Sequence, residues 1–183
     1  MSAGFQESLF AKYSIDTNVI LSFLGDGEYE RYPLDVFGPQ WDFLDAAFLD
    51  GRVVAARRVK TELQKWEYLD RVKAWRDSHD FVFQDITTDE QLAAAKAIVN
   101  QYPAYGLNWN YLCDLEVMAL AKARALTVIS LESPKQHRAD RPKIPNVCDE
   151  FRIGHLVLLD FLREEGFAHT APPLVRGFVN HES

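Results

Sequence analysis

The sequence predicts an α/β fold of three layers, in which helices cover both faces of a central, mainly parallel sheet. Short apolar runs alternate with longer segments of helical periodicity, and parallel strands need connections of that length. The 183 residues have 48% hydrophobic content, which suits a single core, and no repeat or low-complexity segment divides them. We therefore expect one folded domain at residues 13–169, with an N-terminal extension (1–12) and a C-terminal tail (170–183).

The first elements follow from apolar runs and turn residues. The start of "YSIDTNVILSF" (13–23) predicts a buried strand, and a short helix from Thr17 to the glycines of "GDG" follows it. The Pro-containing segment "YERYPLDVFGP" (29–39) is expected to be a loop. "QWDFLDAAFLDG" (40–51) has apolar residues at helical spacing and ends in Gly, and "VVAA" (53–56) predicts a second strand.

The middle of the chain begins with a long amphipathic segment. Its apolar residues fall on one stripe from about 57 to 78, which predicts a single helix. A strand at "FVFQDI" (81–86) should follow, and then a helix at "TTDEQLAAAKAIVNQYP" (87–103) that has a Thr/Asp start and stops before its Pro. The aromatic and amide-rich "AYGLNWNY" (104–111) is interpreted as a loop.

The last third continues the alternation. A helix is expected from about Cys113 to Ala125, then a strand at "TVISL" (127–131) and a polar loop at 133–146. "HLVLL" (155–159) predicts a strand, or a strand that passes into a helix, and "DFLREEG" predicts a closing helical turn.

The cysteines and the N-terminus predict a cytoplasmic protein. Cys113 and Cys148 form no paired motif, and the five histidines show no zinc-ligand spacing with them. The first residues lack the basic start and apolar stretch of a signal peptide, and no apolar run is long enough to span a membrane. We therefore expect reduced thiols, no zinc site and no membrane partner.

The charges are strongly segregated along the chain. The net charge of −7 argues against a uniformly basic nucleic-acid binder. However, seven acidic residues lie within 26–50, eight basic residues lie within 52–76, and a second basic run, "KQHRADRPK", covers 135–143. Such runs are often only solvated surface, but basic segments that flank an acidic centre could hold a phosphate backbone.

Four carboxylates occupy positions that could converge. Asp16 and Glu132 each follow a predicted strand, and the carboxyl ends of parallel strands line one crevice. Glu62 borders the apolar stripe of its helix, and Asp114 lies on the buried side of the helix that it opens. Structural alternatives stay open, because Asp16 and Asp114 could serve a helix N-terminus and Glu62 could be a salt-bridged flank residue.

Together the acids favour a hard metal ion. Carboxylates without histidine or thiol partners suit Mg²⁺ or Mn²⁺ and suit zinc poorly. Two carboxylates about 4 Å apart repel by about 4 kcal/mol at an effective dielectric constant of 20, so without a cation some of them should have a raised pKa. With one or two cations, such a site could activate a water molecule and stabilise the charge that builds on a phosphate.

The order and wording of these segments resemble the PIN domain, the nuclease fold of VapC-type ribonuclease toxins. The resemblance covers about residues 13–166 and rests on "IDTNVIL", on the acid in "VKTELQKW", on "CDLEVMALAKA" leading into "LTVISLE", and on a final strand and helix. The segment "IPNVCDE" after the fourth acid is similar to a stand-alone prokaryotic PIN-like group. Many PIN domains have Asp where Glu132 stands, which makes Asp149 a reserve candidate for the cluster, with a helix cap as its alternative.

The resemblance implies hydrolysis of RNA phosphodiester bonds with Mg²⁺ or Mn²⁺. The acidic site would consist of Asp16, Glu62, Asp114 and Glu132, supported by Thr17, Asn18 and Ser130. The basic residues expected to bind RNA are Arg57, Arg58, Lys60, Lys135, Arg138 and Arg141.

The resemblance also implies partners. An antitoxin protein would hold such a toxin in check, and relatives of this fold pair as homodimers. Trp41, Phe43 and Phe48 could form an interface or belong to the core. Trp109 and Tyr111 could stack on unpaired bases or pack inside the protein.

Other phosphate chemistries fit less well. A haloacid-dehalogenase-type phosphatase needs a second Asp two residues after the first, where this chain has Asn18. A receiver domain needs an acidic pair at the first strand, and a Gly-rich phosphate loop with Lys is absent from the sequence. The remaining alternative is a catalytically silent module that binds RNA or protein.

Overall fold

The structure of the protein is a computed structural model, and it describes residues 11–84, 87–133 and 142–167. A sheet of five parallel strands runs through these residues in the order β3-β2-β1-β4-β5. The strands are β1 (Tyr13–Ile15), β2 (Val53–Ala56), β3 (Phe83–Gln84), β4 (Thr127–Ser130) and β5 (Gly154–Val157).

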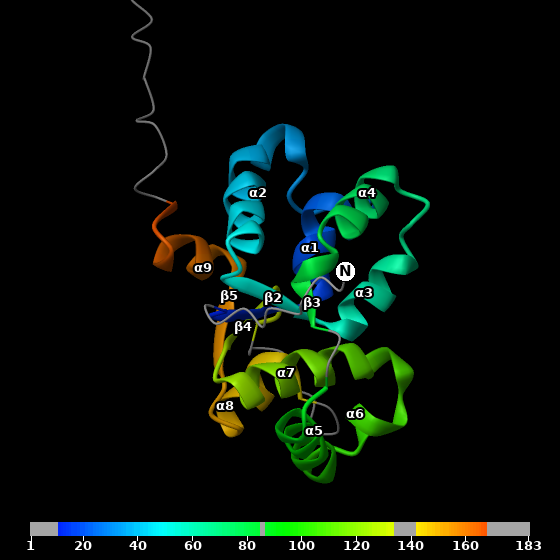
Figure 1. Ribbon diagram of the computed structural model, residues 1–183, viewed down its shortest axis with the longest axis vertical. Coiled ribbons are helices and arrows are strands. Elements are labelled where there is room, and N and C mark those ends of the chain that lie inside the picture. Colours follow the sequence, from blue (N-terminus) through cyan, green and yellow to red (C-terminus); the bar gives the residue numbers. More distant parts are fainter. Residues whose placement is uncertain (1–10, 85–86, 134–141, 168–183) are drawn as a thin grey trace, which may run out of the picture.

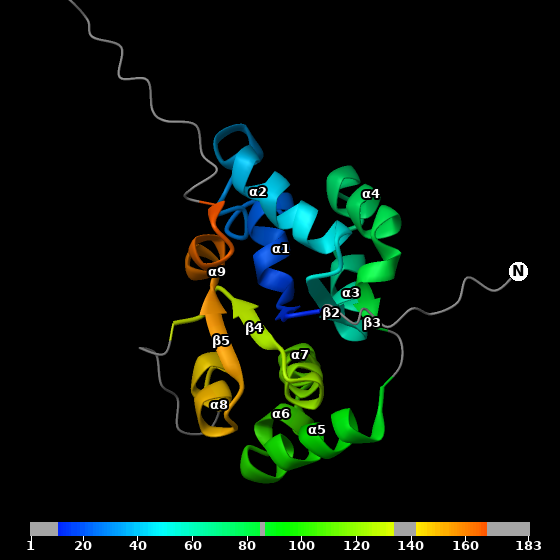
Figure 2. The ribbon, with the colours of Figure 1, turned by 60° about the vertical axis from the view of Figure 1, so that its left-hand side comes forward.

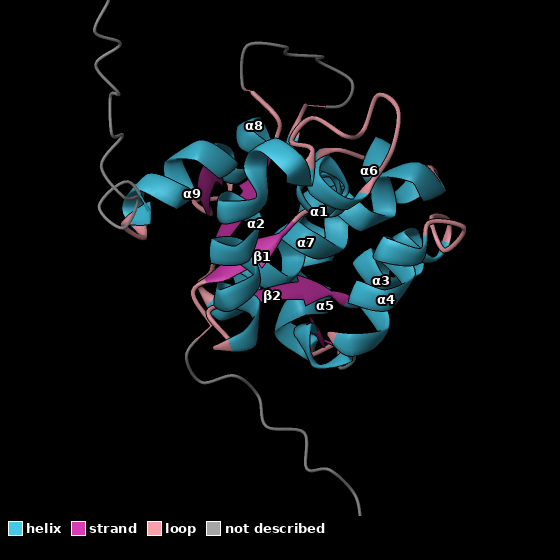
Figure 3. Cartoon of the chain, turned by 90° about the horizontal axis from the view of Figure 1, so that it is seen from above, coloured by secondary structure: helices cyan, strands magenta, loops and turns pink. Residues whose placement is uncertain are grey.

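Helices cover both faces of the sheet, so the predicted three-layer α/β/α fold is confirmed. Figures 1 and 2 show α1, α2, α4 and α9 on one side of the sheet and α5, α6, α7 and α8 on the other. Seen from above, α9 lies at one end of the molecule, and α3 and α4 lie at the other (Figure 3). The helices are α1 (Thr17–Leu24), α2 (Leu34–Leu49), α3 (Arg57–Gln64), α4 (Asp70–Ser78), α5 (Asp89–Gln101), α6 (Ala104–Leu107), α7 (Leu112–Arg124), α8 (Ile144–Glu150) and α9 (Leu158–Glu164). None of them, within the described ranges, is both long and apolar enough to cross a membrane.

The strand order places a topological switch in the middle of the sheet. From β1 the chain builds β2 and β3 outward on one side, and it then returns to add β4 and β5 on the other. Ile15 pairs with Ile129 across the switch, and the N–H of Asp16 donates to the carbonyl of Ile129 at 3.0 Å. In open parallel sheets, ligands bind outside the carboxyl ends of the strands at such a switch. Asp16 therefore stands at the edge where a ligand crevice is expected.

Helix α7 fixes the central strands from the other face. Its Val117 and Met118 are fully buried, and the Ser14 hydroxyl of β1 donates to the carbonyl of Val117 at 3.0 Å. The helix ends at Ala125, whose left-handed φ of 52° turns the chain into β4. Because α7 leads directly into a strand parallel to β1, it runs back across the sheet. Its first turn, with Asp114, therefore lies near the carboxyl ends of the strands.

The long helix expected at 57–78 is wrong, because the chain breaks there into α3 and α4. Between the two helices, the N–H groups of Lys65, Trp66 and Leu69 each bond to the carbonyl three residues earlier, at 3.0 Å. Such bonds tighten and end an α-helix. The apolar stripe continues across the break because Leu63, Val72 and Trp75 still face the core.

The loop expected at 29–39 is also corrected, because α2 begins at Leu34. This helix is kinked at Phe37, which has a φ of −111° and a ψ of 20°. Pro39 lies just after the kink, in the first turn of the second half, where its missing N–H costs little. That second half is the helix predicted at 40–51.

Short helices replace parts of two other expected loops. The segment 104–111 forms α6 and a 3₁₀ turn at Trp109–Tyr111, and α8 begins inside 133–146. The strand expected at 81–86 is reduced to β3 after a 3₁₀ turn at Asp80–Val82. At 155–159 the strand passes into a helix, as one of the two interpretations proposed.

Candidate active site

Asp16 is buried at the end of β1 with part of its carboxylate unpaired. Its side chain is 1% exposed, and it occupies the N-cap position of α1 without making a capping hydrogen bond. Asn18 donates from Nδ2 to Oδ2 of Asp16 at 3.3 Å, and Oδ1 has no hydrogen-bond partner. A helix cap would hold the carboxylate against the first N–H groups of the helix. The side chain of Asp16 makes no capping hydrogen bond of normal geometry, although the backbone N–H of Asn18 in the first turn of α1 still lowers the pKa of this carboxyl.

Burial and neighbouring acids raise the pKa of Asp16 to about 7. The largest cause is loss of hydration, and repulsion from the carboxylates of Glu132 and Glu62 adds to it. The hydrogen bond from Asn18 acts in the opposite direction. The negative charge of Asp16 is thus poorly compensated by the protein itself, as the sequence predicts for carboxylates that meet without a cation.

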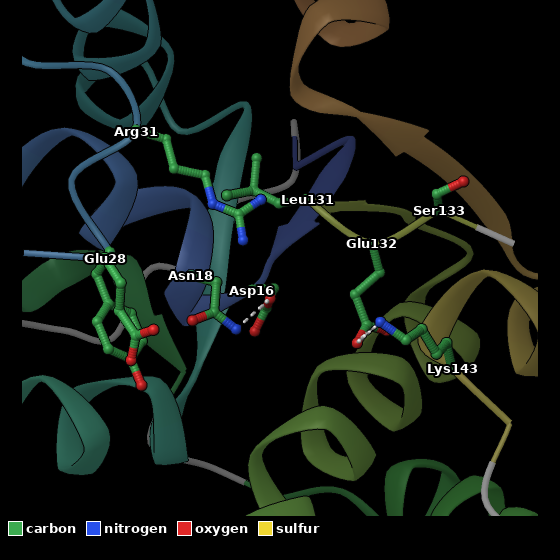
Figure 4. Close-up of a pocket in the computed structure, with 9 residues that line it drawn as sticks. Asp16, Asn18, Glu28, Arg31, Leu131, Glu132, Ser133 and Lys143 are labelled. Atoms are coloured by element: carbon green, nitrogen blue, oxygen red, sulfur yellow. Dashed lines mark hydrogen bonds and ion pairs between the residues drawn. The ribbon is translucent and has the colours of Figure 1, made fainter. Parts of the chain in front are cut away.

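Glu132 faces Asp16 across a cavity but is held from its own side. The cavity has a volume of about 610 Å³ and is lined by Asp16, Asn18, Glu132 and Lys143, among others. Glu132 accepts a hydrogen bond from the N–H of Ile144 at 2.8 Å and lies 3.7 Å from the ammonium of Lys143. Figure 4 shows Asp16 and Asn18 on one side and Glu132 with Lys143 on the other. The fourth acid is therefore anchored to the start of α8 while its carboxylate borders the cavity.

Glu62 and Asp114 line a second cavity that adjoins the first. This cavity has a volume of about 450 Å³, and Asn18, Tyr29 and Glu132 border both. Glu62 comes from α3 and Asp114 from the first turn of α7. The four predicted acids therefore surround one continuous hollow at the carboxyl edge of the sheet. Among the residues that the structure describes, no three His, Cys, Asp or Glu side chains are grouped closely enough to form a metal site as they stand.

The donor set around the hollow fits a hard cation. It contains carboxylate oxygens, and one of them, Oδ1 of Asp16, is buried and has no hydrogen-bond partner. Its raised pKa marks an ionised form that a positive charge would stabilise. Mg²⁺ and Mn²⁺ prefer such oxygen ligands. The chemistry of Asp16 and its neighbours is thus compatible with the metal that the sequence predicts.

The predicted supporting residues tie the acid-bearing segments together. Thr17 is 3.3 Å from the sulfur of Cys113, which joins the start of α1 to the start of α7. Ser130 accepts the N–H of Glu132 at 3.1 Å and is 2.8 Å from Nε2 of His155. Burial lowers the pKa of His155, and the nearby carboxylate of Glu132 partly opposes this shift. These contacts fix the backbone on which Asp16, Asp114 and Glu132 stand.

The comparison with protein families identifies a family for most of the chain. Residues 13–169 match the family described as "Domain of unknown function (DUF4411)". The chain belongs to the DUF4411 family. No curated protein and no solved structure matches the chain.

This DUF4411 chain has cavity residues that the sequence analysis missed. Arg31 and Glu28 come from the loop between α1 and α2, and Lys143 lies at the start of α8. Figure 4 shows the guanidinium of Arg31 extending toward Asn18. Lys143 ends the basic run at 135–143, whereas Arg31 is a lone basic residue within the acidic segment 26–50, and only the fold reveals that both reach the acids.

Tyr29, Trp66 and Tyr68 were also missed. All three line the cavity of Glu62 and Asp114. Trp66 lies on the apolar stripe that predicts a continuous helix at 57–78, and this stripe does not reveal the break between α3 and α4.

The basic residues predicted to bind RNA are only partly placed. Arg57 is exposed at the start of α3, Arg58 pairs with Glu116 at 2.7 Å, and Lys60 pairs with Asp80. The other three predicted residues, Lys135, Arg138 and Arg141, lie outside the described residues.

The remaining candidate residues lie at different distances from the acidic hollow. Asp149 lies in the last turn of α8 and lines a different cavity, with Asn146 and His155. Tyr111 borders the acidic hollow, whereas Trp109 is 78% exposed and has Arg58 5.8 Å from the centre of its ring. Trp41 and Phe48 are buried in the core, and Phe43 packs partly buried against Phe167, so the structure favours the core alternative for these three residues.

Proposed function

We propose that the protein is a metal-dependent ribonuclease that hydrolyses RNA phosphodiester bonds, and that it is the toxin of a toxin–antitoxin pair. The observation that carries the proposal is the buried carboxylate of Asp16, whose Oδ1 is unpaired and whose charge is opposed by Glu62 and Glu132. A carboxylate buried for structural purposes normally finds hydrogen bonds or a basic partner. The likeness of the acid-bearing segments to PIN domains supports the same conclusion.

A bound Mg²⁺ or Mn²⁺ would supply Lewis-acid stabilisation of phosphate charge and a water molecule of lowered pKa. The residues that would hold it are Asp16, Glu62, Asp114 and Glu132, which surround the hollow. Thr17 and Ser130 would keep the segments of these acids in register through their contacts with Cys113 and His155.

Basic side chains beside the acids would bind the substrate's phosphates. Arg31 and Lys143 line the cavity of Asp16, and Lys65 lines that of Glu62. A guanidinium and ammonium groups at the rim of an acidic centre suit a polyanion, because they attract phosphates that the carboxylates alone would repel. The RNA backbone would therefore cross the hollow between the start of α8 and the loop after α1.

The test is cleavage of a labelled RNA by the full chain after removal of divalent ions. We expect cleavage only after Mg²⁺ or Mn²⁺ is added back, and a loss of at least about 100-fold in Asp16→Asn and Asp114→Asn. Asp149→Asn is the matched control, because it makes the same change outside the hollow and should leave cleavage intact. Equal cleavage by all variants would reveal a contaminating nuclease.

The alternative function is a catalytically silent module that binds RNA or protein. Binding of RNA without cleavage under any divalent ion would establish it. Growth arrest on expression in bacteria, relieved by Asp16→Asn, would support the toxin role specifically.

A further inference from the structure

Three aromatic side chains form an uncovered wall beside the acids. Tyr29 comes from the loop after α1, and Trp66 and Tyr68 come from the break between α3 and α4. All three line the cavity that also contains Glu62 and Asp114. Large rings usually bury themselves in a core, yet Tyr68 is 65% exposed and Tyr29 is 39% exposed. Exposed rings beside the acids are therefore suited to bind a ligand that has an apolar face.

The wall is held in a fixed arrangement. Trp66 packs partly buried against the core, and its ring centre lies 4.6 Å from that of Tyr29, edge to face. Tyr68 is stacked on Trp66 with ring centres 6.0 Å apart and an interplanar angle of 29°. The Tyr68 hydroxyl donates to Asp26 at 3.2 Å, which ties the break to the loop after α1. Rings held in this way lose little conformational freedom when a flat ligand stacks on them.

The rim of the wall is polar and carries both signs of charge. Lys65 and Asn110 line the same cavity, together with the carboxylates. A nucleobase has flat apolar faces and hydrogen-bonding edges, and in RNA it is attached to a phosphate that Lys65 can attract. A base can reach such rings only when it is unstacked from its neighbours.

We propose that Tyr29, Trp66 and Tyr68 form a base-binding subsite, which stacks on one unpaired nucleobase of the RNA next to the phosphate at the acids. The proposal rests on the proposed ribonuclease function for its choice of ligand. Because every base has a stacking face, the subsite tolerates different sequences and anchors the strand at a fixed distance from Asp16.

The test uses the full chain in EDTA, so that binding is measured without cleavage. The RNA is a single-stranded oligonucleotide that carries 2-aminopurine, whose fluorescence falls when it stacks, at one position at a time. We expect quenching at one position, and we expect Trp66→Ala and Tyr68→Ala to abolish it and to weaken binding by about 5- to 150-fold.

Two control variants separate stacking from other effects. Tyr68→Phe keeps the ring but removes the hydrogen bond to Asp26, and it should retain the quenching. Phe81→Ala removes an exposed aromatic ring that lines neither cavity of the acids, and it should bind as the wild type does. Thermal melting of each variant checks that the fold is intact.

The outcomes distinguish the subsite from the proposed function. Unchanged binding by Trp66→Ala and Tyr68→Ala overturns the subsite, even if the RNA is cleaved when Mn²⁺ is added. The subsite is also overturned if these variants bind RNA normally but change the oligomeric state in size-exclusion chromatography, because the wall would then be a protein interface. Quenching that depends on the rings, without cleavage under any divalent ion, keeps the subsite and removes the ribonuclease.

Discussion

Replacing Asp16 by Asn should stabilise the metal-free protein near neutral pH. The folded state raises the pKa of Asp16 from 3.8 to about 7, so the ionised side chain is less favourable in the fold than in the unfolded chain. A raised carboxyl pKa means that the folded state binds more protons, and the stability of the wild type falls as pH rises from about 4 to about 7. Asn has the same shape but no charge, so it escapes this penalty.

The size of the effect follows from the shift. The pKa shift is about three units, and each unit corresponds to about 1.36 kcal/mol. At about pH 8, the free energy of unfolding of Asp16→Asn should therefore exceed that of the wild type by on the order of 4 kcal/mol. For a domain of 150–250 residues this corresponds to roughly 8–16 °C in melting temperature. At about pH 4 the advantage of Asp16→Asn should fall below about 1 kcal/mol, because the folded carboxyl is then protonated and nearly half of its unfolded counterpart is protonated too.

The assay is thermal unfolding of both proteins in EDTA across this pH range, with Asp149→Asn as the control for an exposed carboxylate. Mn²⁺ should then raise the melting temperature of the wild type and leave Asp16→Asn nearly unchanged, because the cation stabilises the charge that the variant lacks. If Asp16→Asn destabilises the protein equally at both ends of the range, the carboxylate is a structural hydrogen-bonding group and the electrostatic reasoning is refuted.

Three further predictions concern residues around the hollow. Arg57→Ala should weaken RNA binding and reduce the magnitude of the slope of log affinity against log salt by about 0.7. Lys60→Ala should change this slope less, because Lys60 already pairs with the carboxylate of Asp80. Equal slopes for the two variants would contradict this prediction. Cys113 and Cys148 should resist a thiol reagent at about pH 8 in the folded protein, and both should react in guanidinium. The reason is that burial raises the pKa of Cys113 far above its usual value and that of Cys148 to about 12. Rapid labelling of the folded protein would disprove this prediction. Glu132→Asp should lower stability by about 0.5–1.5 kcal/mol in thermal melts, because the shorter side chain loses the hydrogen bond from the N–H of Ile144 at the start of α8. Glu132→Gln is long enough to keep this hydrogen bond. Similar losses of stability in the two variants would count against this role of the side chain.

The parts of the fold that the sequence predicts well are those where composition and periodicity agree. The strand at 53–56 is a continuous apolar run that the sheet buries, and the strand predicted at 127–131 has Val128 and Ile129 fully buried in β4. The helix at 87–103 has a Thr88 cap that accepts the N–H of Gln91 at 3.2 Å. Asp16 and Glu132 were predicted to share one edge because the carboxyl ends of parallel strands must do so. Placement of these residues needed no knowledge of packing.

The break in the helix at 57–78 could not be predicted from the apolar stripe. An apolar stripe shows only which residues face the core. Val59 and Leu63 of α3 and Val72 and Trp75 of α4 all face the core, so the stripe looks the same whether or not the helix is broken between them. Asp70 is the one local sign of a new helix, since an acid is favoured in a first turn. Side chains such as Arg31 and Tyr29 were missed for another reason: they enter the hollow from a loop, and loop paths depend on contacts distant in the sequence.

The hollow depends on two independent features of the backbone. The switch between β1 and β4 sets Asp16 opposite Glu132, and the end of α3 brings Glu62 and the aromatic wall to the same place. In a continuous helix across 57–78, Trp66 and Tyr68 would lie at other positions, farther along the helix axis. The hydrogen bond from Tyr68 to Asp26 would then be lost. The hollow would then keep its acids and the basic residues at its rim but lose the rings on which a base could stack. Because both features meet at Asn18, Tyr29 and Glu132, chemistry at a phosphate and binding of the adjacent base are expected to be coupled in a single site.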